Sequence, residues 1–172
     1  ALAAGNRVLV KMSEFTPATA TLLAELLARH FDADEVSVVQ GDAAVAHAFS
    51  QLPFDHLFFT GSTAVGHHVM HAAAENLTPV TLELGGKSPV IVAPGYSLEK
   101  AADRILVGKT LNAGQTCIAP DYVLLPEGAE QDFIAAARAV VSACYPEMPI
   151  TPDYSSVVNA RHYERLVGYL ED

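Results

Sequence analysis

The sequence predicts an α/β fold in which a doubly wound, mostly parallel sheet is followed by part of a second α/β lobe. Short, nearly continuous apolar runs recur along the 172 residues, which is typical of parallel strands covered on both faces. Stretches with helical periodicity separate the first four runs and predict the order β-α-β-α-β-α-β. Because this alternation ends at Gly85-Gly86, we expect one lobe over residues 1–86 and a second over residues 87–172.

The first lobe is expected to contain four strands and three helices. Thr16 is a candidate N-cap with Pro17 at the first helical position, and Asp42 can cap a helix that runs through residue 49. Ser62 or Thr63 can open a third helix, to about residue 75. The expected strands are residues 7–10, 35–39, 56–59 and 79–82. The first helix carries an apolar stripe at helical spacing, formed by Leu22, Leu23, Leu26 and Leu27.

The second lobe is expected to begin with a strand at residues 89–92. Ser97 can then cap a helix to about residue 111, and a strand follows at 122–125. A helix over about 129–142 and a last helix over 161–171 flank a loop marked by Pro146, Pro149 and Pro152.

Composition excludes some function classes. The chain has 10 basic and 20 acidic residues, a net charge of −10, and 8% aromatic residues, without a basic cluster. We therefore expect no nucleic-acid groove. No stretch is long and uncharged enough to cross a bilayer, so we expect no membrane association. The two cysteines form no disulfide framework, which favours a reducing, cytoplasmic location. Residues 1–4 resemble the end of a helix, so we expect a piece of a longer protein.

Two motifs indicate covalent chemistry on a carbonyl carbon. Cys117 lies in a loop of small and polar residues, 112–120, and Glu83 ends a strand just before Gly85-Gly86. A thiol can capture a carbonyl, and a partly desolvated carboxylate can activate the water that releases it. The alternatives are a buried structural cysteine and a carboxylate satisfied by the N–H groups of the glycine turn. Cys144, at the end of an Ala/Val-rich helix, is expected to be buried and structural.

Two further motifs can bind a nucleotide. Gly61-Ser62 forms a turn between a strand and a helix, where a phosphate can dock at the helix N-terminus. Lys11 and Glu14 follow the first strand and can hold the hydroxyls of a ribose. Taken alone, the first motif is more typical of an ordinary βα turn, and the second of a solvated strand end. Three histidines on one helix, His67, His68 and His71, are interpreted as a polar face, and we expect no metal site.

Taken together, these motifs resemble those of the aldehyde dehydrogenase superfamily, and the resemblance extends over essentially the whole chain. Residues 83–87 are similar to its glutamate signature, 112–117 to its cysteine signature, 59–62 to its pyrophosphate turn, and 11–14 to its adenosine-ribose site. Residues 118–122 are most similar to the class 3-like branch that includes coniferyl aldehyde dehydrogenases. The resemblance implies a partial Rossmann-like, dinucleotide-binding lobe over 1–86 and the N-terminal part of a catalytic domain over 87–172.

The resemblance also implies chemical roles. Cys117 is the nucleophile that forms a thiohemiacetal, and then a thioester, with a small-molecule aldehyde; the branch it resembles leads us to expect an aromatic, coniferyl aldehyde-like substrate. Glu83 activates the water that hydrolyses the thioester to a carboxylic acid. The backbone N–H of Cys117 provides half of an oxyanion hole.

The resemblance implies cofactor contacts from five residues, which are Lys11, Glu14, Gly61, Ser62 and Leu84. The expected cofactor is NAD, with NADP as an alternative. NAD is favoured because an acidic side chain at position 14 crowds the 2′-phosphate of NADP.

Some family features are missing or changed. Met12 stands where the family usually has proline, and this sequence lacks the segments that carry the second oxyanion donor, the nicotinamide-ribose contact and the oligomerisation surfaces. The resemblance therefore implies a homo-oligomeric parent enzyme and a fragment with impaired or no activity alone. The alternatives are a CoA-acylating dehydrogenase, a non-catalytic nucleotide-binding or interaction module, and a cysteine hydrolase without cofactor.

Overall fold

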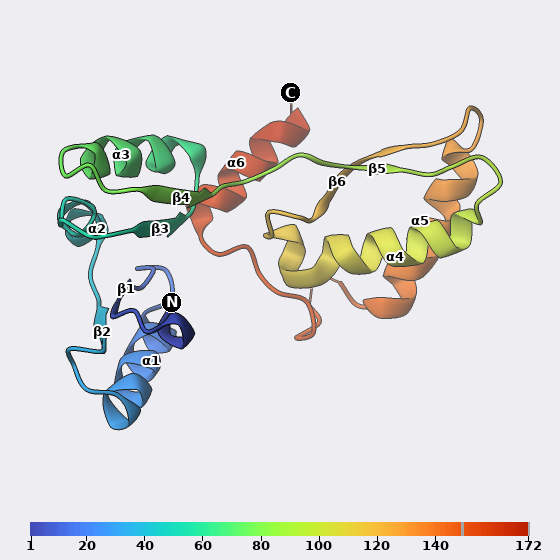
Figure 1. The fold of residues 1–172 in the computed structure, drawn as a ribbon. Helices are drawn as coiled ribbons and strands as arrows, with labels where there is room; N and C mark the ends of the chain where they lie inside the picture. Colours follow the sequence, from blue (N-terminus) through green and yellow to red (C-terminus); the bar gives the residue numbers. More distant parts are fainter. Residues whose placement is uncertain (149, 172) are drawn as a thin grey trace. The chain divides into compact units, whose positions relative to one another are not determined.

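The chain folds into two compact α/β units, Ala1–Leu84 and Gly85–Asp172. They are seen in a computed structural model that describes residues 1–148 and 150–171, so Pro149 of the predicted proline loop lies outside the described residues. In the described residues every strand pair is parallel (Figure 1). This confirms the predicted α/β class with parallel strands; the assignment of the two lobes to cofactor binding and catalysis stays a prediction.

The first unit follows the predicted order of strands and helices. After a short 3₁₀ turn (Leu2–Ala4), its elements are β1 (Val8–Lys11), α1 (Pro17–His30), β2 (Val36–Val39), α2 (Ala43–Ser50), β3 (Leu57–Thr60), α3 (Thr63–Ala74) and β4 (Val80–Glu83). β1 pairs with β2, and β3 pairs with β4. The strands thus pair in parallel as predicted, but only two at a time. The described strands form separate two-stranded sheets and no single continuous sheet.

Helix caps explain where the first unit's helices begin. The Asp42 carboxylate accepts hydrogen bonds from the N–H groups of Ala44 and Val45 at 3.0 and 3.2 Å, and Ser62 accepts one from Val65 at 3.3 Å. Both predicted caps are confirmed. Thr16 precedes α1, but its side chain makes no capping hydrogen bond.

The turn before α1 is closed by Ser13, whose hydroxyl accepts from Phe15 N–H at 3.2 Å and whose carbonyl accepts from Thr16 N–H at 3.4 Å. The leucine stripe of α1 is only partly covered, because Leu22 and Leu26 are exposed.

The second unit is built on a third parallel strand pair. Its elements are β5 (Ser88–Ile91), α4 (Leu98–Thr110), a 3₁₀ segment η2 (Leu111–Gly114), β6 (Pro120–Leu124), α5 (Glu130–Cys144) and α6 (Ala160–Glu171). Ser97 caps α4 as predicted, accepting from Lys100 N–H at 3.2 Å. β6 starts two residues earlier than predicted, because Pro120 is already in register with Ser88. The core consists of Val92, Ala101 and Ile105, covered by Val90, Leu98, Leu106, Val123, Leu125 and Phe133.

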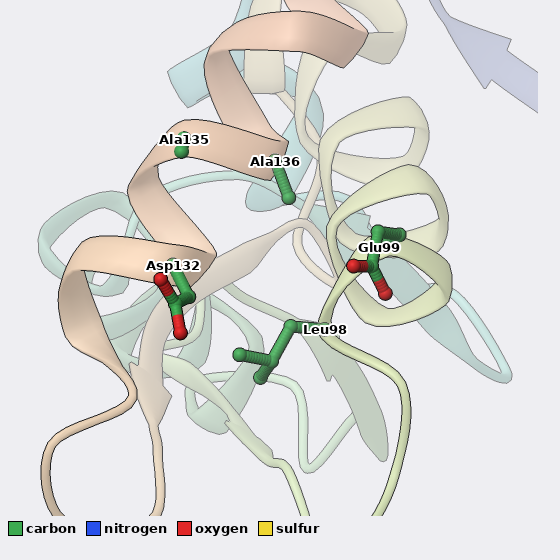
Figure 2. Close-up of a pocket in the computed structure, with 5 residues that line it drawn as sticks. All are labelled: Leu98, Glu99, Asp132, Ala135 and Ala136. Carbon is green, nitrogen blue, oxygen red and sulfur yellow. The ribbon is translucent and has the colours of Figure 1, made fainter.

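A shallow hollow of about 470 Å³ lies between α4 and α5. Figure 2 shows Leu98 and Glu99 on one helix facing Asp132, Ala135 and Ala136 on the other. It opens at the N-terminal end of α4, whereas the cysteine loop follows the C-terminal end. At a rise of 1.5 Å per residue, the thirteen residues of α4 separate the hollow from the cysteine loop by roughly 20 Å. The hollow is therefore separate from the predicted site.

Candidate active site

Four of the predicted site residues lie together at the carboxyl ends of β3 and β4. Thr60 is in register with Glu83, and the Gly61 N–H donates to the Glu83 carbonyl oxygen at 3.0 Å. Leu84 packs beside the first turn of α3, since a Cβ added to Gly66 would lie 3.0 Å from Leu84 Cδ2. Parallel strands thus bring the predicted phosphate turn and the predicted general base to one edge of the sheet.

The Gly61-Ser62 turn has the features of an anion site. Ser62 caps the twelve-residue helix α3, whose N-terminal N–H groups and dipole favour a negative charge. A Cβ at Gly61 would overlap the Phe59 ring, so only glycine fits at that point without displacing the ring. The Glu83 side chain is exposed at the same edge.

Lys11 and Glu14 form an ion pair after β1. Lys11 Nζ lies 3.4 Å from Glu14 Oε2, and the two side chains are 11% and 38% exposed. The lysine is therefore held in a defined position while the carboxylate remains accessible. Between them, Met12 N–H donates to Val39 O at 3.1 Å. A proline at position 12 could not make this hydrogen bond, so Met12 extends the pairing of β1 with β2.

These groups fit a dinucleotide. An ion pair at a strand end offers a donor and an acceptor to ribose hydroxyls, and a capped glycine turn offers backbone N–H groups to a pyrophosphate. Both features belong to the first unit.

The loop before Cys117 has an unusual backbone. Asn112, Ala113 and Gly114 have φ values of 51°, 55° and 74°, all in the left-handed region. Asparagine and glycine adopt it readily, whereas alanine pays about 1–2 kcal/mol. Such strain persists only where surrounding contacts enforce it, and it is concentrated at functional sites.

Cys117 itself is exposed in these 172 residues. Its backbone N–H has no hydrogen-bond acceptor among residues 1–148 and 150–171, so it is free to donate to an oxyanion. Its carbonyl oxygen accepts from Ser88 Oγ at 3.5 Å, and a Cβ at Gly86 would lie 3.0 Å from the same oxygen. An ion pair of 3.5 Å between Lys87 and Asp121 lies beside it.

Residues 86–88 therefore brace the cysteine loop. Sequence reasoning missed this, although Lys87 ends the glutamate motif and Ser88 directly follows it. The sequence feature that could have indicated this contact is the pair Gly85-Gly86, because glycine permits close approach of another backbone segment. Cys144 was expected to be buried and is exposed, because it ends α5 where the chain turns away.

Comparisons with known proteins identify the family of this chain. Residues 1–172 match the aldehyde dehydrogenase family. This chain belongs to that family. It is 59% identical over 172 residues to a "Probable coniferyl aldehyde dehydrogenase" of Pseudomonas aeruginosa, covering 100% of this chain and 36% of the relative. It is 58% identical over 170 residues to the coniferyl aldehyde dehydrogenase of a Pseudomonas strain, covering 99% of this chain and 35% of that protein.

Solved structures of aldehyde dehydrogenases have the same fold. Staphylococcus aureus AldH, in a substrate-bound state, superposes with a TM-score of 0.92 at 44% identity, over 99% of this chain and 37% of that one. A Mycobacterium tuberculosis aldehyde dehydrogenase in complex with NAD⁺ superposes with a TM-score of 0.88 at 34% identity. The match covers 99% of this chain and 36% of that one. This aldehyde dehydrogenase chain thus spans about a third of the length of its relatives.

Other expectations for this aldehyde dehydrogenase chain concern metals and membranes. Among the described residues His67, His68 and His71 are exposed, and no group of three metal-binding side chains is found. No helix in the described part of the chain is both long and apolar enough to cross a bilayer.

Proposed function

We propose that this chain is the central part of an NAD(P)-dependent aldehyde dehydrogenase that oxidises an aldehyde, of the coniferyl aldehyde type, to a carboxylic acid. Family membership supports aldehyde oxidation, and the names of the relatives at 58–59% identity support an aromatic substrate. The complete protein would be homo-oligomeric, as the family resemblance implies, and cytoplasmic, as the lack of a disulfide framework indicates. The 172 residues alone would have little or no activity.

The observation that carries this proposal is the state of Cys117. The residue is exposed, its backbone N–H has no acceptor among residues 1–148 and 150–171, and the loop before it has a left-handed conformation. A thiolate at this position attacks the aldehyde carbon, and the free N–H faces the negative charge that develops on oxygen. The carbonyl π bond breaks as the C–S bond forms, and the product is a thiohemiacetal.

Glu83 is the proposed general base. It belongs to the first unit and Cys117 to the second, and the linker between them is short. Gly86 touches the carbonyl of Cys117, and Glu83 is three residues before Gly86. Three peptide units span at most about 11 Å, so the Cα of Glu83 lies within that distance of the Cα of Gly86. In the proposed role the Glu83 carboxylate takes a proton from the water that attacks the thioester.

Five residues of the first unit would hold the cofactor. Lys11 and Glu14 would bind the adenosine ribose, Gly61 and Ser62 the pyrophosphate, and Leu84 would line the site. A bound nicotinamide supplies the hydride acceptor for the oxidation. The accessible Glu14 carboxylate disfavours a 2′-phosphate by charge repulsion, which favours NAD over NADP.

The same residues distinguish this function from three alternatives. A CoA-acylating dehydrogenase would have no use for a base that activates water, so Glu83 disfavours it. A cofactor-free cysteine hydrolase leaves the Lys11–Glu14 pair and the α3 turn without a role. A non-catalytic nucleotide-binding module predicts NAD binding by the chain and no dependence of turnover on Cys117.

The test is aldehyde-dependent NADH formation by the full-length protein that carries these residues, with Cys117→Ala and Glu83→Gln. Cys117→Ala should reduce turnover to background, whereas Cys144→Ala, the matched control, should leave it unchanged. Glu83→Gln should keep the first NADH burst and slow steady-state turnover by about a hundredfold, since a general base contributes that much.

Undiminished turnover in Cys117→Ala would overturn the proposal. An equal loss of burst and steady state in Glu83→Gln would remove only the general-base role.

A further inference from the structure

Gln115, two residues before Cys117, uses both ends of its side-chain amide. Its Nε2 donates to Asn112 O at 2.9 Å and to Ser156 O at 3.1 Å, and its Oε1 accepts from Val158 N–H at 2.9 Å. A primary amide has two N–H donors, and both are satisfied here. The side chain is partly buried.

These hydrogen bonds join segments that are far apart in sequence. Ser156 and Val158 lie 41 and 43 residues after Gln115, in the segment without helix or strand that precedes α6. The Asn112 oxygen belongs to the first of the three left-handed residues, and the backbone N–H of Gln115 also donates to it, at 3.1 Å. The Gln115 side chain therefore bonds to the strained turn and also connects that turn to the segment before α6.

Resting on the proposed function, we propose that Gln115 is a positioning residue for the reaction of Cys117. It touches no reacting atom in the described structure. It fixes the turn from which residues 116 and 117 emerge, and so sets the direction of the thiol and of the Cys117 N–H. A displacement of about 1 Å at such a group can lower turnover by about a hundredfold.

The chemistry of the site requires glutamine. Glutamate would keep an acceptor for Val158 N–H but lose both donors, and its carboxylate would face the Asn112 and Ser156 oxygens. Methionine would keep the size and lose all three hydrogen bonds. Asparagine is one methylene shorter and cannot reach all three partners at once.

The experiment uses the full-length enzyme with Gln115→Glu and Gln115→Met. The same substitutions at Gln131, an exposed residue of α5 without side-chain hydrogen bonds in the described residues, are the matched controls. Both Gln115 variants should lower kcat by roughly ten- to a hundredfold, with the KM for NAD within about twofold. Alkylation of Cys117 by iodoacetamide, followed by mass spectrometry, should slow relative to Cys144 in the same molecule. The Gln131 variants should match wild type.

A pH series separates positioning from simple loss of packing. As the pH is lowered, the introduced carboxyl of Gln115→Glu becomes protonated and regains one O–H donor. The kcat of Gln115→Glu divided by the kcat of Gln131→Glu should therefore rise as the pH falls. The kcat of Gln115→Met divided by the kcat of Gln131→Met should not change with pH. Where Gln115→Met does not fold, the Gln115→Glu ratio decides alone.

The inference is overturned if Gln115 variants match the Gln131 controls in kcat and in Cys117 alkylation, or if the Gln115→Glu ratio is independent of pH. Either result leaves the role of Cys117 intact, because that role is judged separately by Cys117→Ala.

Discussion

At the scale of single residues, two adjacent glycines have different surroundings. A Cβ at Gly86 would lie 3.0 Å from the Cys117 carbonyl oxygen, whereas a Cβ at Gly85 would have nothing within 4 Å in the described chain. The distance at Gly86 is tighter than ordinary van der Waals contact, so one of the two groups must move. Close backbone approach therefore explains Gly86, and the structure places no such demand on Gly85.

Gly86→Ala should consequently disturb Cys117 while Gly85→Ala should not. The added methyl pushes the Cys117 carbonyl by a few tenths of an ångström, and we expect kcat of the full-length enzyme to fall by about tenfold. Gly85→Ala is the control, expected within about twofold of wild type in the same NADH assay. Equal losses in the two variants would show that the contact at Gly86 is not the cause.

At the scale of elements, two helices differ in how their first turn is satisfied. Ser97 caps α4 through a hydrogen bond to Lys100 N–H, while Thr16 precedes α1 without a side-chain cap. Sequence patterns predicted both caps from residue type alone. Before α1 the Ser13 hydroxyl accepts from Phe15 N–H, which precedes the helix, and Thr16 makes no side-chain cap.

Ser97→Ala should therefore destabilise the second unit, and Thr16→Ala should have little effect. Loss of a serine cap costs about 1 kcal/mol in the free energy of unfolding. Urea unfolding of the 172-residue chain, followed by circular dichroism, measures the difference. A similar loss for Thr16→Ala would contradict the assignment of the caps.

Ser97 also makes the stability of α4 depend on pH. Its hydroxyl donates to Glu99 Oε2 at 2.7 Å, and this bond, with the backbone N–H of Glu99, holds the pKa of Glu99 below its ordinary value. A carboxyl with a lowered pKa stabilises the fold above its unfolded pKa, and this contribution disappears as the pH falls through the folded pKa. The stability gap between wild type and Ser97→Ala should accordingly narrow in acid.

At the scale of the whole molecule, much apolar surface is uncovered. Among the described residues no large side chain is fully buried, and the exposed fraction reaches 74% at Ile91, 81% at Ile118 and 89% at Leu77. Strands of parallel sheets are normally covered on both faces. Because the 172 residues span about a third of the length of the relatives, we predict that these side chains are covered in a protein of that full length.

The isolated 172-residue chain should bind the apolar dye ANS and associate as its concentration increases, because large exposed apolar patches drive both. The full-length protein, measured in parallel, should bind far less dye per residue. Dye fluorescence and sedimentation velocity measure the two effects. A monomeric chain with no dye enhancement would show that these side chains are covered in solution.

The sequence by itself determined the fold class, the order of the elements and the motifs at Glu83, Cys117, Gly61-Ser62 and Lys11/Glu14. These follow from local rules, since periodicity, caps and turn residues act within a few positions along the chain. Only the tertiary structure decided that Gly86 and Ser88 brace Cys117 and that Gln115 reaches Ser156 and Val158. Those contacts join residues 29 to 43 positions apart, and no local propensity encodes which distant backbone group a side chain will meet.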